Sequence, residues 1–405
     1  MVDFFQGFSL SEAEKSECFN ELFKQVLAPS DRQPSRYLVS KEESDYLSVS
    51  KSVFDVSLNI TAINHRYKED LIYSIVFDKV SFFGSGYCTI NGKLLLDLLT
   101  NTLVDVNAFA NGGFYEKCNL KDVNTSMDRY VSHNINKNTQ DSLNPRNTHI
   151  LPFGRRSFNF AHWHLNTLSS IYLAMHHVPE AIIVLPKLNN WQKESLISLG
   201  LYNEDKITEI SVLDSCIVPN AMFFNTSFVW QRIPAVKPMI SMFKDADFAR
   251  NPPEGIFNKW PTLPSRIYLS RKTDPNHKLV NEQLVEKELA SRGFIILEPQ
   301  TISYHELAYL LAHVDILAGQ TGSALIRAGM CKPGAILIQL AYEGITDYIF
   351  HKTAVFAGCS KSYVYLEPEQ SIIIGPDAVK ANHFHRISGW SVNIDNFKAF
   401  MQSIF

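Results

Sequence analysis

The chain has 405 residues, which predicts two or three domains at about 100–200 residues per domain. Hydrophobic residues make up 45% of the chain and aromatic residues 12%, so it can bury a sizeable core, and wholesale disorder is excluded. The net charge of −3 provides no basic field for DNA or RNA. We therefore expect no nucleic-acid partner.

The amino-terminal residues carry no positive segment followed by an apolar run, so we predict no signal peptide. No apolar stretch approaches the roughly 18 residues of a transmembrane helix. The 6 cysteines are scattered and form no C-x-x-C pair, which favours a reduced compartment over a disulfide or zinc framework. We expect a cytoplasmic protein, and the sequence leaves peripheral attachment to the inner face of the membrane open.

Strand-like and helix-like segments alternate along most of the chain. An Asn91-Gly92 pair between apolar runs predicts a hairpin within residues 71–98. After it, the pattern predicts a helix that ends before Pro179, a strand over 181–186 and a helix closed by Gly200. This alternation is typical of βαβ units around a parallel sheet.

The four prolines of residues 244–264 predict a linker. The alternation then resumes, with Asn281 and Ser303 as expected N-caps of two helices. We predict an α/β protein with two Rossmann-like domains, divided into a first domain over 1–243, the linker over 244–264, a second domain over 265–390 and a terminal helix over 391–405.

The junction DILAGQTGSALIRAGM is the sharpest motif. A buried strand is expected to end at Gly319, and the turn Gln320-Thr321-Gly322 leads directly into a helix. Unpaired N–H groups at the helix start and the hydroxyls of Thr321 and Ser323 could hold a diphosphate, and Gly322 allows close approach of the backbone. An ordinary tight turn between strand and helix is the alternative.

Two further candidates lie in the same predicted domain. Arg271 and Lys272 follow the strand predicted over 266–270, where a guanidinium could neutralise a phosphate; a solvated surface pair is the alternative. Glu306 lies in the first turn of a predicted helix. Its carboxylate could bind a ribose hydroxyl, or it could simply favour the helix dipole.

The first half of the chain offers His162-Trp163-His164. Histidine can act as a general base near neutral pH, and His162 shares a helix face with Asn166; a structural histidine is the alternative. No further ligand stands at metal-binding spacing, so we predict no metal site, and we discount Asp245-Ala246-Asp247 because it lies in the predicted linker. Arg155, beside Arg156, could attract an anionic acceptor or be solvated.

Several of these segments together resemble the family-61 glycosyltransferases over about residues 155–365. The segments that carry the resemblance are N-F-A-H-W at 159–163, R-I-Y-L-S-R at 266–271, N-E at 281–282, G-F at 293–294, S-Y-H-E-L at 303–307, D-I-L-A-G-Q-T-G-S-A-L at 315–325 and K-P-G-A-I-L-I-Q-L at 332–340.

The resemblance implies a GT-B fold, in which two Rossmann-like domains face a central cleft. It further implies inversion at the anomeric carbon, donors such as UDP-N-acetylglucosamine or UDP-xylose, and no bound metal. It makes 1–243 the acceptor-side domain and 265–390 the nucleotide-sugar-binding domain. It places Arg271 and Thr321-Gly322-Ser323 at the diphosphate, Glu306 near the nucleoside and His162 on the acceptor side. The donor-binding residues predicted in all are Arg271, Lys272, Glu306, Gly319, Thr321, Gly322 and Ser323.

The chain departs from the family pattern at four places. Many members have histidine in place of Thr321, glutamine in place of Leu307 and Pro-Arg in place of Ser169-Ser170. Many also carry an acidic residue where Asn166 stands, and that residue could orient or supply the base. Eukaryotic members normally carry an amino-terminal membrane anchor. No such segment is apparent in this sequence, so we expect a bacterial-type enzyme.

We therefore expect an inverting glycosyltransferase that moves a sugar from a nucleotide-sugar donor, first of all a UDP-sugar, to a hydroxyl of an oligosaccharide or glycolipid acceptor. The expected pathway is surface polysaccharide or lipooligosaccharide synthesis, with no cofactor. His162 is the first candidate base and His164 the second. Three alternatives stay open: a nucleotide-sugar epimerase, a non-catalytic carbohydrate-binding or scaffold subunit, and a purely structural pair of Rossmann domains.

Overall fold

The computed structural model describes residues 74–83, 87–90, 93–94, 147–152, 157, 159–211, 214–224, 226, 232–272, 279–342, 349–367, 372–374 and 387–405. The described part of the chain divides into two compact units between Met239 and Ile240, within helix α8 (Arg232–Asp245). Among the described helices, none has both the length and the hydropathy that a membrane-spanning segment requires.

The first unit holds a seven-stranded mixed sheet, with the strand order β3-β2-β1-β7-β4-β5-β6. Its elements are β1 (Ser74–Phe83), β2 (Tyr87–Ile90), β3 (Lys93–Leu94), β4 (His149–Ile150), α5 (Phe160–His162), the π-helix η5 (Trp163–Leu168), α6 (Ser169–His177), β5 (Ile182–Pro186), α7 (Asn190–Ser198), the 3-10 helix η6 (Glu204–Lys206), β6 (Ile207–Ile210) and β7 (Ser215–Phe224). Strands β2 and β3 pair antiparallel on either side of residues 91–92, which confirms the predicted hairpin.

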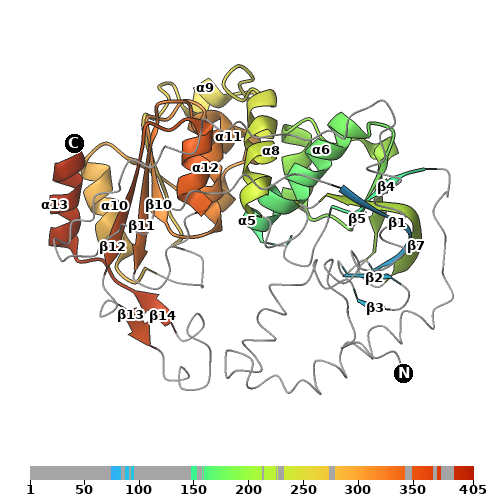
Figure 1. Ribbon diagram of the computed structural model, residues 1–405. Coiled ribbons are helices and arrows are strands. Elements are labelled where there is room, and N and C mark those ends of the chain that lie inside the picture. Colours follow the sequence, from blue (N-terminus) through green and yellow to red (C-terminus); the bar gives the residue numbers. More distant parts are fainter. Residues whose placement is uncertain are drawn as a thin grey trace. The chain divides into compact units, whose positions relative to one another are not determined.

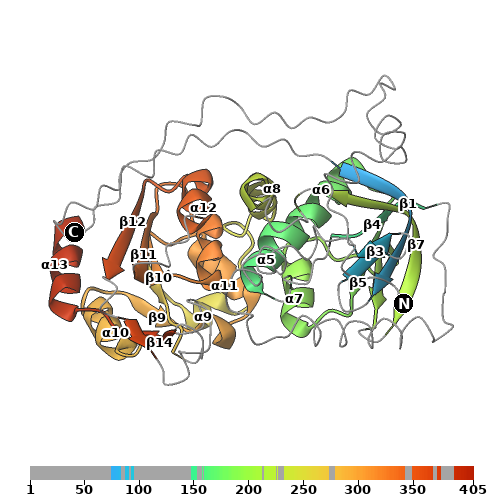
Figure 2. The same cartoon turned by 60° about the horizontal axis from the view of Figure 1, so that its bottom comes forward.

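Four strands of this sheet are parallel, namely β7, β4, β5 and β6. Their spatial order, with β7 and β5 on either side of β4, is the order of four neighbouring strands in a doubly wound fold. Helices α5, α6 and α7 lie on the same side of these strands (Figure 2). The chain therefore changes its winding direction between β4 and β7, and a ligand site is expected at the carboxyl ends of these two strands.

The second unit is built on a five-stranded, fully parallel sheet with the order β12-β11-β10-β8-β9. Its elements are α9 (Ile256–Lys259), β8 (Arg266–Leu269), α10 (Glu282–Ser291), β9 (Ile295–Leu297), the 3-10 helix η8 (Pro299–Thr301), α11 (Tyr304–Leu311), β10 (Ile316–Gln320), the 3-10 helix η9 (Ser323–Met330), β11 (Ile336–Tyr342), α12 (Ile349–Ala357), β12 (Lys361–Glu367), β13 (Ile372–Ile374), β14 (Ile387–Trp390) and α13 (Ile394–Ile404).

This parallel sheet lies between two layers of helices. Figure 1 shows α10 and α13 on one side of β10–β12, and α11 and α12 on the other. The core on the α10 and α13 side includes Tyr268, Ile338, Tyr365, Phe397 and Phe400, all fully buried. Numbered in chain order with β8 as the first, the strands lie in the spatial order 2-1-3-4-5. In this order the winding direction changes between the first and the third strand, which are β8 and β10. These results confirm the predicted α/β class.

The stretch 244–264, predicted as a linker, contains more structure than its prolines suggest. Asp245 ends α8, and Phe248 and Ile256 are buried. Helix α9 lies within the stretch, and its residue Lys259 pairs with Glu306 of α11. Long-range packing of two apolar side chains thus orders a segment without helical or strand periodicity.

Asn281 differs from its predicted role. It stands at the N-cap of α10, but its side chain makes no capping bond there. Instead, its amide donates to Val392 O at 2.7 Å and accepts from Val392 N at 3.0 Å. Asn281 therefore ties the start of α10 to the segment before α13, 111 residues away.

We expect Asn281→Ala to lower the stability of the second unit by about 1–3 kcal/mol, because it leaves both backbone groups of Val392 without their partner. Thermal unfolding followed by circular dichroism would measure the change. A control is Asn251→Ala, since the exposed Asn251 side chain donates to the nearby turn carbonyls of Ala246 and Asp247. Equal melting temperatures for the two variants would contradict the prediction.

Candidate active site

The switch point of the second sheet brings together the two sharpest sequence motifs. Arg271 follows β8, and Thr321 follows β10, the strand that pairs with β8. The Arg271 guanidinium donates from Nη1 to Thr321 O at 2.9 Å. The structure thus joins two predicted phosphate ligands that are 50 residues apart at the edge where doubly wound folds bind ligands.

The turn at Thr321 is held from two sides. Its backbone N–H donates to Leu340 O at 2.7 Å, and Gln339 Nε2 donates to its hydroxyl oxygen at 2.8 Å. Because the oxygen accepts from Gln339, the hydroxyl can donate its own hydrogen to an anionic oxygen. Sequence reasoning missed Gln339, which belongs to β11 and comes close only through the pairing of β10 with β11.

Backbone N–H groups open the 3-10 helix η9 beside this turn. Leu325 N donates to Gly322 O at 3.0 Å, so the N–H groups of Gly322, Ser323 and Ala324 precede the first helical bond. Such groups and the helix dipole favour an anion. With the Arg271 guanidinium they form a candidate diphosphate site, and η9 replaces the α-helix that is usual at this position.

The two predicted glycines have different roles. An added Cβ at Gly322 would lie 2.1 Å from Arg271 Nη1, so glycine is needed for the guanidinium to occupy its place. An added Cβ at Gly319 would lie 2.9 Å from Leu325 Cδ2 and 3.5 Å from Leu269 O. Gly319 is buried, and it allows β10 to pack closely against apolar neighbours.

We expect Gly322→Ala to weaken nucleotide binding about 10–100-fold, because Arg271 must move and loses a charge-assisted interaction of about 1.5–3 kcal/mol. The melting temperature should fall as well, because Gly322 has φ at 159° and ψ at 171°, a backbone conformation that residues with a Cβ rarely adopt. Isothermal titration calorimetry with UDP measures the affinity. In an Arg271→Ala background the same substitution should have no further effect, and an undiminished effect there would contradict this explanation.

Glu306 and Lys272 have simpler surroundings. Glu306 lies in the first turn of α11, and its Oε1 accepts from Trp260 Nε1 at 2.8 Å and from Lys259 Nζ at 2.8 Å. These contacts hold α9 against α11. The role of Glu306 at a nucleoside stays a prediction. Lys272 is exposed beside Arg271, and its backbone N–H donates to Ser270 Oγ at 3.3 Å.

His162 lies at the switch point of the first sheet, in the helix that follows β4. Asn159 caps this helix by accepting from Ala161 N and His162 N. His162 is 8% exposed, and its Nδ1 lies 3.0 Å from Asn166 Oδ1. The predicted i, i+4 pair thus forms a hydrogen bond.

The partners of Asn166 determine the tautomer of His162. Asn166 Nδ2 donates to Thr226 O at 2.8 Å, and a carbonyl can only accept. Asn166 must therefore turn Oδ1 toward His162, and Oδ1 accepts from Nδ1–H. In the neutral ring Nε2 then carries the lone pair, as a general base requires. Thr226 follows β7, and through it a neutral amide, that of Asn166, orients the imidazole.

His164 occupies a different environment from His162. It is fully buried, its Nδ1 lies 2.7 Å from Phe160 O, and its ring lies 4.1 Å from that of Phe160. A ring without solvent exposure suits a packing role better than contact with an acceptor. Both histidines adjoin or lie in a π-helical stretch, η5, a form that occurs often at functional sites.

The remaining positions from the sequence are Arg155 and the Asp245-Ala246-Asp247 segment. Arg155 lies outside the described residues. Within the described part of the chain, no group of three His, Cys, Asp or Glu side chains could hold a metal ion. Asp247 pairs with Arg250 at 3.6 Å in the turn after α8.

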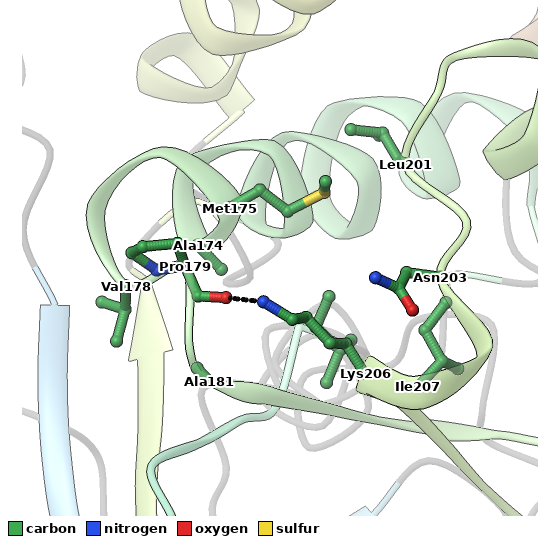
Figure 3. A pocket seen from close by; sticks show the side chains of 10 residues that line it. Ala174, Met175, Val178, Pro179, Ala181, Leu201, Asn203, Lys206 and Ile207 are labelled. Atoms are coloured by element: carbon green, nitrogen blue, oxygen red, sulfur yellow. Dashed lines mark hydrogen bonds between the residues drawn. The ribbon is translucent and has the colours of Figure 1, made fainter.

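A pocket in the first unit lies away from His162. Figure 3 shows it between the end of α6, the start of β5 and Lys206, which donates to Pro179 O at 2.5 Å. Its lining residues Ala181, Lys206 and Ile207 stand at the amino ends of β5 and β6. His162 follows the carboxyl end of β4, which is parallel to β5, so the pocket and His162 lie at opposite ends of the strands.

The comparison with protein families gives a match that contains both the Arg271–Thr321 site and the His162–Asn166 pair. The model of the family Glycosyltransferase 61 matches residues 160–338, from α5 to β11. None of the curated proteins compared matches the chain. The match includes His162, Asn166, Arg271 and the turn at Thr321, and it spans a little under half of the chain. Over these residues the chain is similar to the family-61 glycosyltransferases, and the similarity supports a glycosyltransferase.

Proposed function

We propose that this protein is an inverting glycosyltransferase of the GT-B type, which transfers a sugar from a UDP-linked donor to a hydroxyl of a glycan acceptor. The observation that carries the proposal is the site at the β8–β10 switch point. There, the Arg271 guanidinium, the Thr321 hydroxyl and the backbone N–H groups at the start of η9 provide hydrogen-bond donors close together. The similarity to glycosyltransferases over residues 160–338 supports a nucleotide sugar as the ligand.

In the proposed reaction, the nucleotide diphosphate leaves with developing negative charge. Arg271 would bind the phosphate oxygens through its guanidinium, and the N–H groups at the start of η9 would stabilise the charge that forms at bond cleavage. The hydrogen bond from Arg271 to Thr321 O preorganises the guanidinium before the sugar nucleotide binds. Preorganised donors lower the barrier because they need no reorientation as charge develops.

His162 is the proposed general base. Its Nε2 would take the proton of the acceptor hydroxyl as the oxygen attacks the anomeric carbon from the side opposite the nucleotide, and the configuration inverts. Asn166 supports this role by holding Nδ1–H, so that the lone pair is on Nε2. A surface polysaccharide or lipooligosaccharide as acceptor, and a cytoplasmic place of action, stay predictions.

Thermal stability of the full chain against UDP, GDP, CMP and ADP, each with magnesium and with EDTA, tests the proposal. We expect a selective rise in melting temperature with UDP that survives EDTA, because a ligand at 100 times its Kd stabilises by about 2.7 kcal/mol. A rise that needs magnesium would contradict the proposal that Arg271 and the start of η9 stabilise the charge of the diphosphate. No rise with any nucleotide would contradict the function and favour a glycan-binding subunit.

Product analysis separates the transferase from an epimerase. The nucleotide sugar that stabilises the protein is incubated with and without an oligosaccharide acceptor, and both nucleotide and sugar are followed by mass spectrometry. We expect UDP release coupled to a mass gain of the acceptor. Conversion of the donor into an isomer without acceptor would contradict glycosyl transfer.

A further inference from the structure

Glu282 is a buried carboxylate beside the proposed nucleotide site. It is the first residue of α10 and is only 4% exposed. Its Oε1 atom accepts three hydrogen bonds, from Tyr268 OH at 2.9 Å, from Arg271 N at 3.0 Å and from Gln320 Nε2 at 2.7 Å. One oxygen therefore connects both strands that border the switch point.

Two of these donors belong directly to the phosphate-binding segments. Arg271 donates its backbone N–H to Glu282 and its guanidinium to Thr321 O, so both ends of the residue are held. Gln320 ends β10 and immediately precedes Thr321. Glu282 thus determines where the backbone of Arg271 turns away from β8 and where the chain leaves β10.

The environment of Glu282 indicates that the charge matters. A buried ionised carboxylate is costly unless it is hydrogen-bonded, and bonds to a charged acceptor are stronger than neutral ones. Burial and the nearby Glu282 carboxylate raise the pKa of Tyr268, so the phenol keeps the hydrogen that it donates. The start of α10 also favours a negative charge through the helix dipole.

The segment that carries Glu282 is anchored independently of the site. Asn281 holds both backbone groups of Val392, and Val280 N donates to Trp390 O at 2.9 Å. Glu282 is therefore fixed by the body of the domain, and the loops carrying Arg271 and Thr321 are oriented against it.

We propose that Glu282 is a positioning residue of the nucleotide site: its carboxylate orients Arg271 and the end of β10 so that guanidinium and turn donors converge on the donor's diphosphate. The inference rests on the proposed function, because it concerns the same site. It assigns to Glu282 an effect on nucleotide affinity that acts through Arg271 and through the turn after β10.

The test is a double-mutant cycle on the full chain, with UDP affinity measured by calorimetry well below the melting temperature. We expect Glu282→Gln to weaken UDP binding about 10-fold, from the loss of charge-assisted bonds. In the Arg271→Ala background the same change should have a smaller effect, because the guanidinium is gone and only the turn after β10 is still positioned by Glu282. Glu288→Gln is the matched control: Glu288 lies in the same helix, pairs with Arg292 at 2.6 Å and should leave UDP affinity unchanged.

The outcomes separate this inference from the proposed function. If wild-type protein binds no nucleotide, the proposed function fails first. If wild-type protein binds UDP but Glu282→Gln binds it equally well, or if the losses from Glu282→Gln and Arg271→Ala simply add, Glu282 is not a positioning residue. A lower melting temperature with unchanged affinity would identify a purely structural role. Tyr268→Phe gives a second check: it removes one donor to Glu282 and leaves the Arg271 and Gln320 donors in place, so it should lower stability more than UDP affinity.

Discussion

His162→Ala is expected to lower turnover by about 10²–10⁴-fold, the usual contribution of a general base, while UDP affinity stays within experimental error of the wild type. The reason is the hydrogen bond from Nδ1–H to Asn166 Oδ1, which places the lone pair on Nε2 for the acceptor proton. The donor site residues belong to other elements and are unaffected. UDP release with donor and acceptor present measures the turnover.

A matched control uses another histidine of the same helical stretch. His176 is exposed near the end of α6, where its Nδ1 lies 2.9 Å from Tyr172 O. His176→Ala should retain turnover, so a general effect of removing an imidazole is excluded. Near-normal turnover of His162→Ala would remove this residue from the role of base, and reduced UDP affinity would point to a role in the donor site instead.

Arg271→Ala should reduce both nucleotide affinity and turnover. Loss of the guanidinium removes charge-assisted bonds worth about 1.5–3 kcal/mol, or about 10–100-fold in UDP affinity. Turnover should fall by about 10²–10³-fold further, as when a donor to developing charge is removed from an active site. Saturation kinetics with varied UDP-sugar, together with calorimetry, separate the two effects.

Arg271→Lys distinguishes charge from geometry. Lysine retains the positive charge but lacks the planar fork that can donate to Thr321 O and to a phosphate at the same time. We expect partial recovery of affinity and little recovery of turnover. Unchanged UDP affinity in Arg271→Ala would show that the β8–β10 switch point is not the nucleotide site.

Much of the architecture follows from local sequence. Alternating apolar and amphipathic segments between residues 159 and 342 predict the order of strands and helices, because periodicity and capping are properties of neighbouring residues. The Ser303 side chain caps α11 by accepting from Glu306 N, and Gly293 follows α10 with φ at 80°, as local signals indicate. The 3-10 form of η9 and the π-helical η5 were not predicted, since tertiary packing selects such forms.

Local pattern also predicted the separate pieces of the candidate site: Arg271 after one strand, the Thr321 turn after another, and His162 facing Asn166 one helical turn away. Their chemical setting depends on partners distant in the chain. Thr226 orients Asn166 across 60 residues, Gln320 reaches Glu282 across 38, and Gln339 reaches Thr321 across 18. Only the strand order of the folded sheets brings these groups within hydrogen-bond distance. By itself, therefore, the sequence determined the class of fold and the candidate residues, whereas the tertiary structure decided the tautomer of His162, the orientation of Arg271 and the part taken by Glu282.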